Sequence, residues 1–151
     1  MSTALGNALP RELLDDLSGK DLSARWTKTI PLVTIDGNGF PHFVVLSYGE
    51  ILAAGERELR LGMYPNSSTS RNMRERPNVG LLIVQGDSVY YIKGLAKEHA
   101  AENVARFDVT VEQVLVDNEP GARITSGLQF EMAQGKDWWM GTAEKTLAAL
   151  R

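Results

Sequence analysis

Two β-rich runs and the turn signal between them occupy residues 30–48, which read IPLVTIDGNGFPHFVVLSY. Isoleucine, valine and phenylalanine favour extended strands. The turn signal Asp36-Gly37-Asn38-Gly39 supplies the residues that a tight connection between antiparallel strands needs. These residues therefore predict a β-hairpin.

Further strands are expected on the C-terminal side of this hairpin. Alternating apolar residues predict a strand over 59–63, and strands are also expected over 89–95 and 104–116. The run over 79–85 is almost wholly apolar, which predicts a strand buried on both faces. Leu128 and Phe130 suggest a last short strand, whereas 98–105 fits either a strand or a helical turn.

Helical patterns lie outside the strands. Pro10 precedes a leucine stripe that predicts a helix to about residue 18, and Pro77 stops a short helix over 69–76. The tail after Gly135 has Trp139 and the apolar residues that follow it at helical spacing. We expect one mainly β domain over 1–151, a β-barrel with peripheral α-helices, comprising an N-terminal helical segment (1–25) and a C-terminal helix (136–151).

Composition excludes several function classes. The 151 residues are 43% hydrophobic and 23% charged, which is typical of a globular protein, and the net charge of −3 argues against a nucleic-acid binder. The chain has no cysteine and two histidines, so Cys-ligated zinc, thiol catalysis and a multi-histidine metal site are not expected. The apolar runs are too short to span a membrane. We expect a cytoplasmic protein without a nucleic-acid, membrane or metal partner.

The chemically informative stretch is 60–76, where Arg60, Arg71, Arg74 and Arg76 face a single acid, Glu75. Hydroxyl side chains precede the short helix in this stretch. Hydroxyls, free amides at a helix start and guanidinium groups suit an anion with several acceptor oxygens, such as the terminal phosphate of a small ligand. The alternative is equally compatible with the residues: the hydroxyls cap the helix and the arginines are solvated.

Three segments in order resemble the FMN-binding split-barrel family, the pyridoxamine 5′-phosphate oxidase-like proteins. Residues 32–42 resemble its first hairpin, in which "D-x-x-G-x-P-H" is frequent, and residues 72–79 resemble its "N-L-R-x-x-P-x-V" signature. Residues 90–96 are similar to the following strand, which ends in "G-x-A". The resemblance covers roughly 30–96.

The resemblance implies a split barrel that works as a homodimer, with FMN in a groove between the subunits and a small-molecule substrate. The family's phosphate loop commonly reads "S-x-K"; here Ser67 falls at the serine and Thr69 at the lysine, so the positive charge must come from an arginine. The departure also leaves open weak FMN binding, a deazaflavin or no flavin. The expected cofactor contacts are Arg60, Leu61, Gly62, Met63, Tyr64, Ser67, Ser68, Thr69, Ser70, Arg71, Asn72 and Arg74.

Other side chains have functional and structural interpretations. Trp138 is a candidate to cover a flavin ring across the dimer interface, although interface packing is the commoner use of such a residue, and Trp139 is expected in the core. His42 is a candidate acid or base but fits a structural histidine better. No catalytic residue is assigned, because a flavin would carry the chemistry. The sequence therefore leaves two hypotheses, a small FMN-dependent oxidoreductase and a non-catalytic dimer that holds flavin, deazaflavin or haem.

Overall fold

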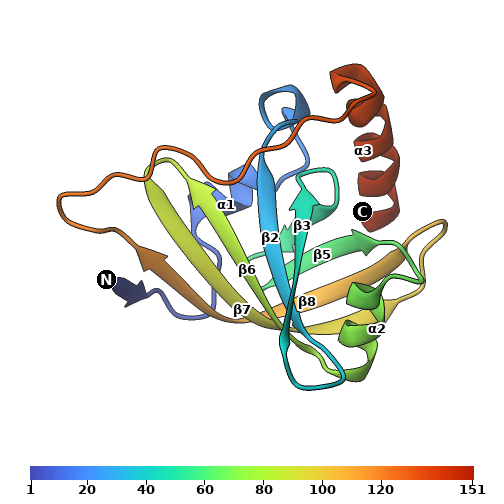
Figure 1. The fold of residues 1–151 in the computed structure, drawn as a ribbon, viewed down its shortest axis with the longest axis horizontal. Helices are drawn as coiled ribbons and strands as arrows, with labels where there is room; N and C mark the ends of the chain where they lie inside the picture. The colour runs from blue at the N-terminus through green and yellow to red at the C-terminus, as the bar shows by residue number, and fades with distance from the viewer.

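The computed structural model describes residues 1–151 and contains one antiparallel sheet that curls into a half-barrel (Figure 1). The strand order is β3-β2-β6-β7-β8-β5-β4, with β1 paired to the far end of β8. The strands are β1 (Ser2–Ala4), β2 (Thr29–Ile35), β3 (Pro41–Ser47), β4 (Ile51–Gly55), β5 (Glu58–Met63), β6 (Asn78–Gln85), β7 (Ser88–His99) and β8 (Ala105–Asp117). The expectation of a mainly β barrel-like fold with a few helices is confirmed.

The predicted hairpin forms as β2 and β3, paired from Thr29–Ser47 to Ile35–Pro41. Its turn is stabilised by Asp36, whose carboxylate accepts hydrogen bonds from the amides of Asn38 and Phe40 at 2.9 Å. The Asp-Gly-Asn-Gly signal thus determines the register of the two strands.

The helices close the ends and the open side of the half-barrel. They are α1 (Arg11–Asp16), the 3₁₀-helix η1 (Leu22–Ala24), α2 (Ser68–Glu75) and α3 (Lys136–Leu150). Helix α2 packs against β2 and β7, and α3 packs against β4, β5 and η1. No helix has the length and apolar character that a membrane crossing requires.

Two apolar clusters hold these elements together. The main core fills the concave side of the sheet, and it includes the one-sided row Ala105, Phe107, Val109 and Val111 of β8. A second cluster ties α3 to β4 and η1 through Leu52 and a stripe of α3 side chains, Trp139, Ala143, Leu147 and Leu150. The helical spacing of the C-terminal tail is therefore confirmed, as is the core position of Trp139.

Several sequence-based expectations need correction. Strand β6 is buried on one face only: Val79, Leu81 and Ile83 point into the core, while the alternate residues are half-buried, because no helix covers the convex face there. The segment 98–105, for which the sequence left a strand and a helical turn open, is not helical: β7 continues to His99 and β8 begins at Ala105. Around Leu128 there is a single bridge, Lys28–Gln129, rather than a strand. The N-terminal segment 1–25 is not helical throughout, because it begins with β1. Strand β4 was not predicted at all.

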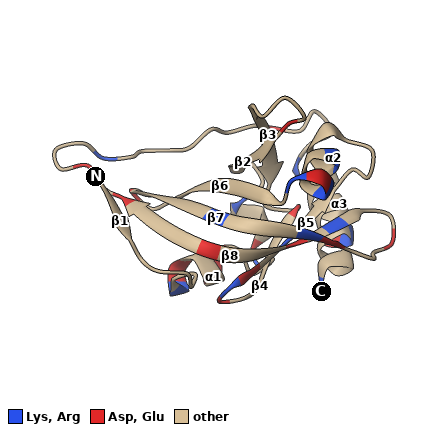
Figure 2. Ribbon diagram, turned by 90° about the horizontal axis from the view of Figure 1, so that it is seen from below, with Lys and Arg blue, Asp and Glu red and all other residues tan.

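Charge divides the sheet into two halves. The three neighbouring strands β3, β2 and β6 contain no Lys, Arg, Asp or Glu. Acidic and basic residues instead lie side by side along β5, β7 and β8 and on α2 (Figure 2). One half of the sheet thus carries no Asp, Glu, Lys or Arg side chain, and the other carries side chains of both charges.

Candidate functional site

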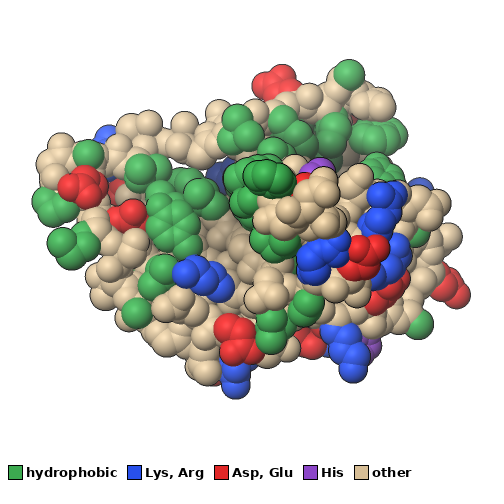
Figure 3. Space-filling view, turned by 60° about the horizontal axis from the view of Figure 1, so that its bottom comes forward, with side chains coloured by type: hydrophobic (Ala, Val, Ile, Leu, Met, Phe, Trp, Pro, Cys, Tyr) green, Lys and Arg blue, Asp and Glu red, His purple; other side chains and the backbone are tan.

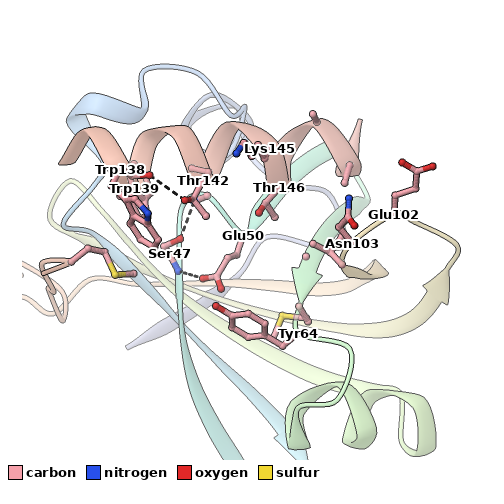
Figure 4. A pocket seen from close by; sticks show the side chains of 18 residues that line it. Ser47, Glu50, Tyr64, Glu102, Asn103, Trp138, Trp139, Thr142, Lys145 and Thr146 are labelled. Atoms are coloured by element: carbon pink, nitrogen blue, oxygen red, sulfur yellow. Dashed lines mark hydrogen bonds between the residues drawn. The ribbon is translucent and has the colours of Figure 1, made fainter. Parts of the chain in front are cut away.

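The main cavity lies where α3 passes over the end of β3 and the end of β5 (Figure 4). Its volume is about 730 Å³, within the ordinary range for pockets that bind small organic molecules. Ser47 lines it from the end of β3, Glu50 from the β3–β4 turn, and Gly62 and Met63 from β5, and α3 forms its roof. Half of its lining residues are apolar, so the cavity suits a ligand that has both apolar and polar parts.

Two glycines allow α3 to lie this close to the sheet. A Cβ atom at Gly49 would stand 2.5 Å from Ala143 Cβ and 3.0 Å from Ala143 Cα. A Cβ atom at Gly62 would stand 2.7 Å from Thr146 Cγ2. Both distances are shorter than a carbon–carbon contact allows, so the roof of the cavity depends on the absence of side chains at these two positions.

Glu50 is the acidic group inside the cavity. Its Oε2 atom accepts a hydrogen bond of 2.6 Å from the backbone amide of Ser47, which fastens the side chain across the β3–β4 turn. Burial raises the pKa of Glu50, while the bond from Ser47 opposes that shift. Glu50 forms no ion pair. Two other charged residues, Glu102 and Lys145, line the cavity at its exposed rim.

Aromatic side chains stand at the mouth of the cavity. Trp138 is 47% exposed and Tyr64 is 80% exposed, whereas Trp139 is buried behind them. Figure 4 shows the Tyr64 ring between the cavity and α2. Tyr64 directly follows β5, and α2 begins four residues later, so the chain runs from the cavity wall into the start of that helix within a short loop.

The start of α2 uses several of its polar groups internally. The Ser67 hydroxyl caps the helix by accepting from the Ser70 amide at 3.1 Å, and Ser70 Oγ donates to the Tyr64 carbonyl at 2.7 Å. The Asn72 amide donates to the buried Thr34 hydroxyl at 3.0 Å. The structure therefore shows the Ser67 hydroxyl as the helix cap and the Ser70 hydroxyl bound to the backbone of the preceding loop.

Groups that remain available at this helix start are fewer. The amides of Ser68 and Thr69 are in the first turn, where no intrahelical acceptor exists, and the Ser68 side chain is exposed. The Thr69 side chain is only 3% exposed. The position of the family's lysine is thus filled by a small side chain that is turned inward.

The four arginines of the 60–76 stretch do not converge. Arg60 donates to the Leu150 carbonyl of α3 at 2.9 Å and forms an ion pair with Glu58 of β5. Its guanidinium group is therefore already bound within the protein. Arg74 forms a bidentate pair with Glu98, at 2.6 and 3.0 Å.

The remaining two arginines differ from each other. Arg76 pairs with Glu75 and donates to the Asp36 carbonyl at 3.0 Å. Arg71 is exposed and makes no ion pair, so it is the arginine of this stretch with a free guanidinium group.

The residues proposed from the sequence thus fall into three groups. Gly62, Met63, Tyr64 and Trp138 lie around one cavity. Ser67, Ser68, Thr69, Ser70, Arg71 and Asn72 lie together at the start of α2. Arg60, Leu61 and Arg74 belong to neither group, because Leu61 is fully buried in the core and the two arginines are paired elsewhere.

Sequence reasoning missed most of the cavity wall. Ser47, Gly49 and Glu50 come from the end of β3 and the turn after it, which carry no recognised motif. Thr142 and Thr146 come from α3, and Thr146 lies close to Gly62 of β5. The small residues of α3 were the available signal, because a helix face without large side chains permits a close approach. Neither His42 nor His99 lines the cavity, and His99 Nε2 lies 3.4 Å from Asp108.

Comparisons with known proteins agree with this architecture. No family model matches the chain. It is 24% identical over 131 residues to YclD of Bacillus subtilis (strain 168), a protein described as uncharacterized, and the match covers 83% of this chain and 85% of YclD.

Solved structures give the clearer result. A candidate pyridoxamine 5′-phosphate oxidase from Lactobacillus delbrueckii superposes with a TM-score of 0.59 at 16% identity, over 74% of this chain and 97% of the other. Another from Listeria innocua gives 0.53 at 19% identity, over 71% and 99%. At these identities the match shows the fold. The chain has the split-barrel fold of pyridoxamine 5′-phosphate oxidase-like proteins, and the resemblance drawn from residues 30–96 is confirmed at that level.

Proposed function

We propose, from the split-barrel fold shared with pyridoxamine 5′-phosphate oxidase-like proteins, that this protein binds FMN and acts as a small flavin-dependent oxidoreductase. The observation that carries the proposal is the cavity under α3, which has aromatic residues at its mouth. Helix α2, with the free arginine Arg71 in it, begins four residues after Tyr64, which lines that mouth. A flavin needs two features side by side: an apolar slot for its ring, and an anion site for the phosphate at the end of its tail.

The cavity fits the ring system in size and chemistry. A planar aromatic ligand of drug-like size is accommodated by about 730 Å³, and Trp138 offers a half-exposed ring against which it can stack. When bound, a flavin supplies hydride transfer, while the protein supplies position, hydrogen bonds and exclusion of water. Ser47, Gly62 and Met63 would define the floor on which the ring rests.

The phosphate would lie at the start of α2. The free amides of Ser68 and Thr69 and the positive end of the helix dipole favour an anion there. Arg71 is the charged group available to it, since Arg60 and Arg74 are paired elsewhere. The single free arginine would replace the charge that Thr69 does not provide.

A homodimer is part of this proposal. The uncharged strands β3, β2 and β6 present apolar side chains on their convex face, including Phe43 at 70% exposure and Val45 at 41%. Phe40, in the hairpin turn, is 67% exposed. Figure 3 shows hydrophobic side chains gathered over this hairpin, next to the charged side chains of α2. A two-fold partner would cover such a surface and border the mouth of the cavity.

The binding test compares FMN with riboflavin, which lacks the phosphate. Arg71→Ala should weaken FMN by about tenfold or more, because a charge-assisted contact contributes about 1.5 kcal/mol or more, and should leave riboflavin unchanged. Arg11→Ala on α1, an exposed arginine at the opposite end of the half-barrel, is the matched control. Titration with quenching of flavin fluorescence measures both ligands. Equal loss of both ligands, or no uptake of FMN at micromolar concentration, would contradict the proposal.

The second candidate is a non-catalytic flavin-binding dimer. The observation in its favour is the inward-turned Thr69, which leaves the helix start with one free cation. Reduction of bound flavin by NADH or NADPH, followed by absorbance, separates the two. Turnover with either donor supports the oxidoreductase, and a flavin that binds but is never reduced supports the second candidate.

A further inference from the structure

The feature that the flavin does not account for is the carboxyl group of Glu50. It lies on the β3–β4 turn beneath α3, half-buried and facing the cavity together with Tyr64 (Figure 4). One of its oxygens accepts from the Ser47 amide, and neither oxygen meets a basic side chain. The cavity therefore contains an acidic group with spare acceptor capacity and no ion-pair partner.

An unpaired carboxylate in such a place is costly. Removal of a charged group from water is unfavourable unless a hydrogen-bond donor or an opposite charge compensates it. Lys145 does not supply this compensation, because it is an exposed residue at the level of α3, above Glu50 in Figure 4, and forms no ion pair with it. The missing partner is thus a donor that arrives with a ligand.

The rest of the lining indicates which kind of donor fits. Trp138 and Tyr64 place aromatic rings at the mouth, and the negative face of an aromatic ring attracts a cation. Thr142 and Thr146 add hydroxyl oxygens from α3 that accept hydrogen bonds, and the Thr142 hydroxyl donates to the Trp138 carbonyl at 3.1 Å. An anionic ligand would meet the half-buried Glu50 carboxylate in this cavity and is disfavoured.

We infer that the cavity binds a small organic cation, an amine or a guanidine, whose positive group is held by the Glu50 carboxylate and whose apolar body lies against Tyr64, which leaves Trp138 to the flavin ring. This inference rests on the proposed function, which selects the cavity, and it names the chemical class of the substrate that the protein would take there. Glu50 is the specificity-determining residue: it selects cations over neutral and anionic compounds of the same shape.

The alternative role for Glu50 is purely structural, as a clasp of the β3–β4 turn. Glu50→Gln separates the two roles, because the amide oxygen of glutamine still accepts from Ser47 while the charge is lost. Glu102→Gln is the matched control, since Glu102 lines the same cavity but is exposed at its rim.

The experiment measures binding of butylamine, butylguanidine and phenethylamine to the full chain by titration calorimetry at pH 7, with 2-phenylethanol and 3-phenylpropionate as neutral and anionic comparisons. At least one of the cations should bind roughly tenfold or more tightly than both comparisons. Glu50→Gln should abolish that preference, and Glu102→Gln should change it less than twofold. Thermal unfolding of each variant confirms that it is folded.

Titrations with and without saturating FMN separate the two proposals. Cation-selective binding without uptake of FMN would overturn the proposed function and leave this inference standing. FMN uptake without a preference for cations would overturn this inference alone. Failure of all three cations to bind, or an unchanged preference in Glu50→Gln, would also overturn it.

Discussion

Gly49→Ala tests how α3 forms the roof of the cavity. The added methyl group would lie 2.5 Å from Ala143 Cβ and 3.0 Å from Ala143 Cα, whereas carbon atoms in contact prefer about 3.5–4.0 Å. The obstructing atoms belong to the backbone and a rigid side chain, so α3 must move by about 1 Å. Overpacking of this kind costs about 1–3 kcal/mol.

The matched control is Gly141→Ala on the exposed side of the same helix. Nothing lies within 4 Å of a Cβ atom there, so the substitution relieves a helix-interior glycine and should stabilise the protein by about 0.5–1 kcal/mol. The two variants should therefore shift in opposite directions although both add one methyl group.

Urea unfolding followed by tryptophan fluorescence gives the free energy of unfolding of each variant. Gly49→Ala should also lower the affinity of any ligand of the cavity, because a displaced α3 moves Trp138 and Thr142. The reasoning is refuted if Gly49→Ala is as stable as the wild type while Gly141→Ala behaves as expected, because α3 would then not be held against the β3–β4 turn.

Two further predictions concern α2 and Glu50. Ser67→Ala removes the helix cap and should lower the free energy of unfolding by about 1 kcal/mol. The control Ser68→Ala, at an exposed position, should change it by less than about 0.5 kcal/mol. Denaturant midpoints measure both effects, and equal effects would show that the cap is not formed. Burial raises the pKa of Glu50 in the folded state, so the folded protein binds the Glu50 proton more tightly than the unfolded chain does. The contribution of Glu50 to stability is therefore lost as pH rises from about 4.5, the ordinary pKa, through the raised pKa of the folded state. Glu50→Gln should therefore gain stability relative to the wild type as pH increases over that window. The charged neighbours at the rim of the cavity are Lys145 and Glu102. A difference in the free energy of unfolding that does not depend on pH would contradict the burial argument.

Local patterns were reliable where the causes of structure are themselves local. The hairpin turn at Asp36 is made by that residue's own carboxylate, and α2 begins at a serine and ends before Pro77. Strand β4 was missed because its two alanines carry little β-propensity, and its pairing with β5 is what makes it a strand. The burial of one face of β6 likewise depends on which side the helices cover.

The candidate site shows the same division. The sequence on its own determined the strand-rich fold, the capped helix after Tyr64 and the excess of arginines around it, because turn chemistry, capping and composition act over a few residues. Only the tertiary structure decided which groups are available to a ligand. It paired Arg60 with the end of α3 and Arg74 with Glu98, turned Thr69 inward, and brought Glu50 beneath a helix some ninety residues away. Those outcomes follow from packing and long-range ion pairing, which no local pattern encodes.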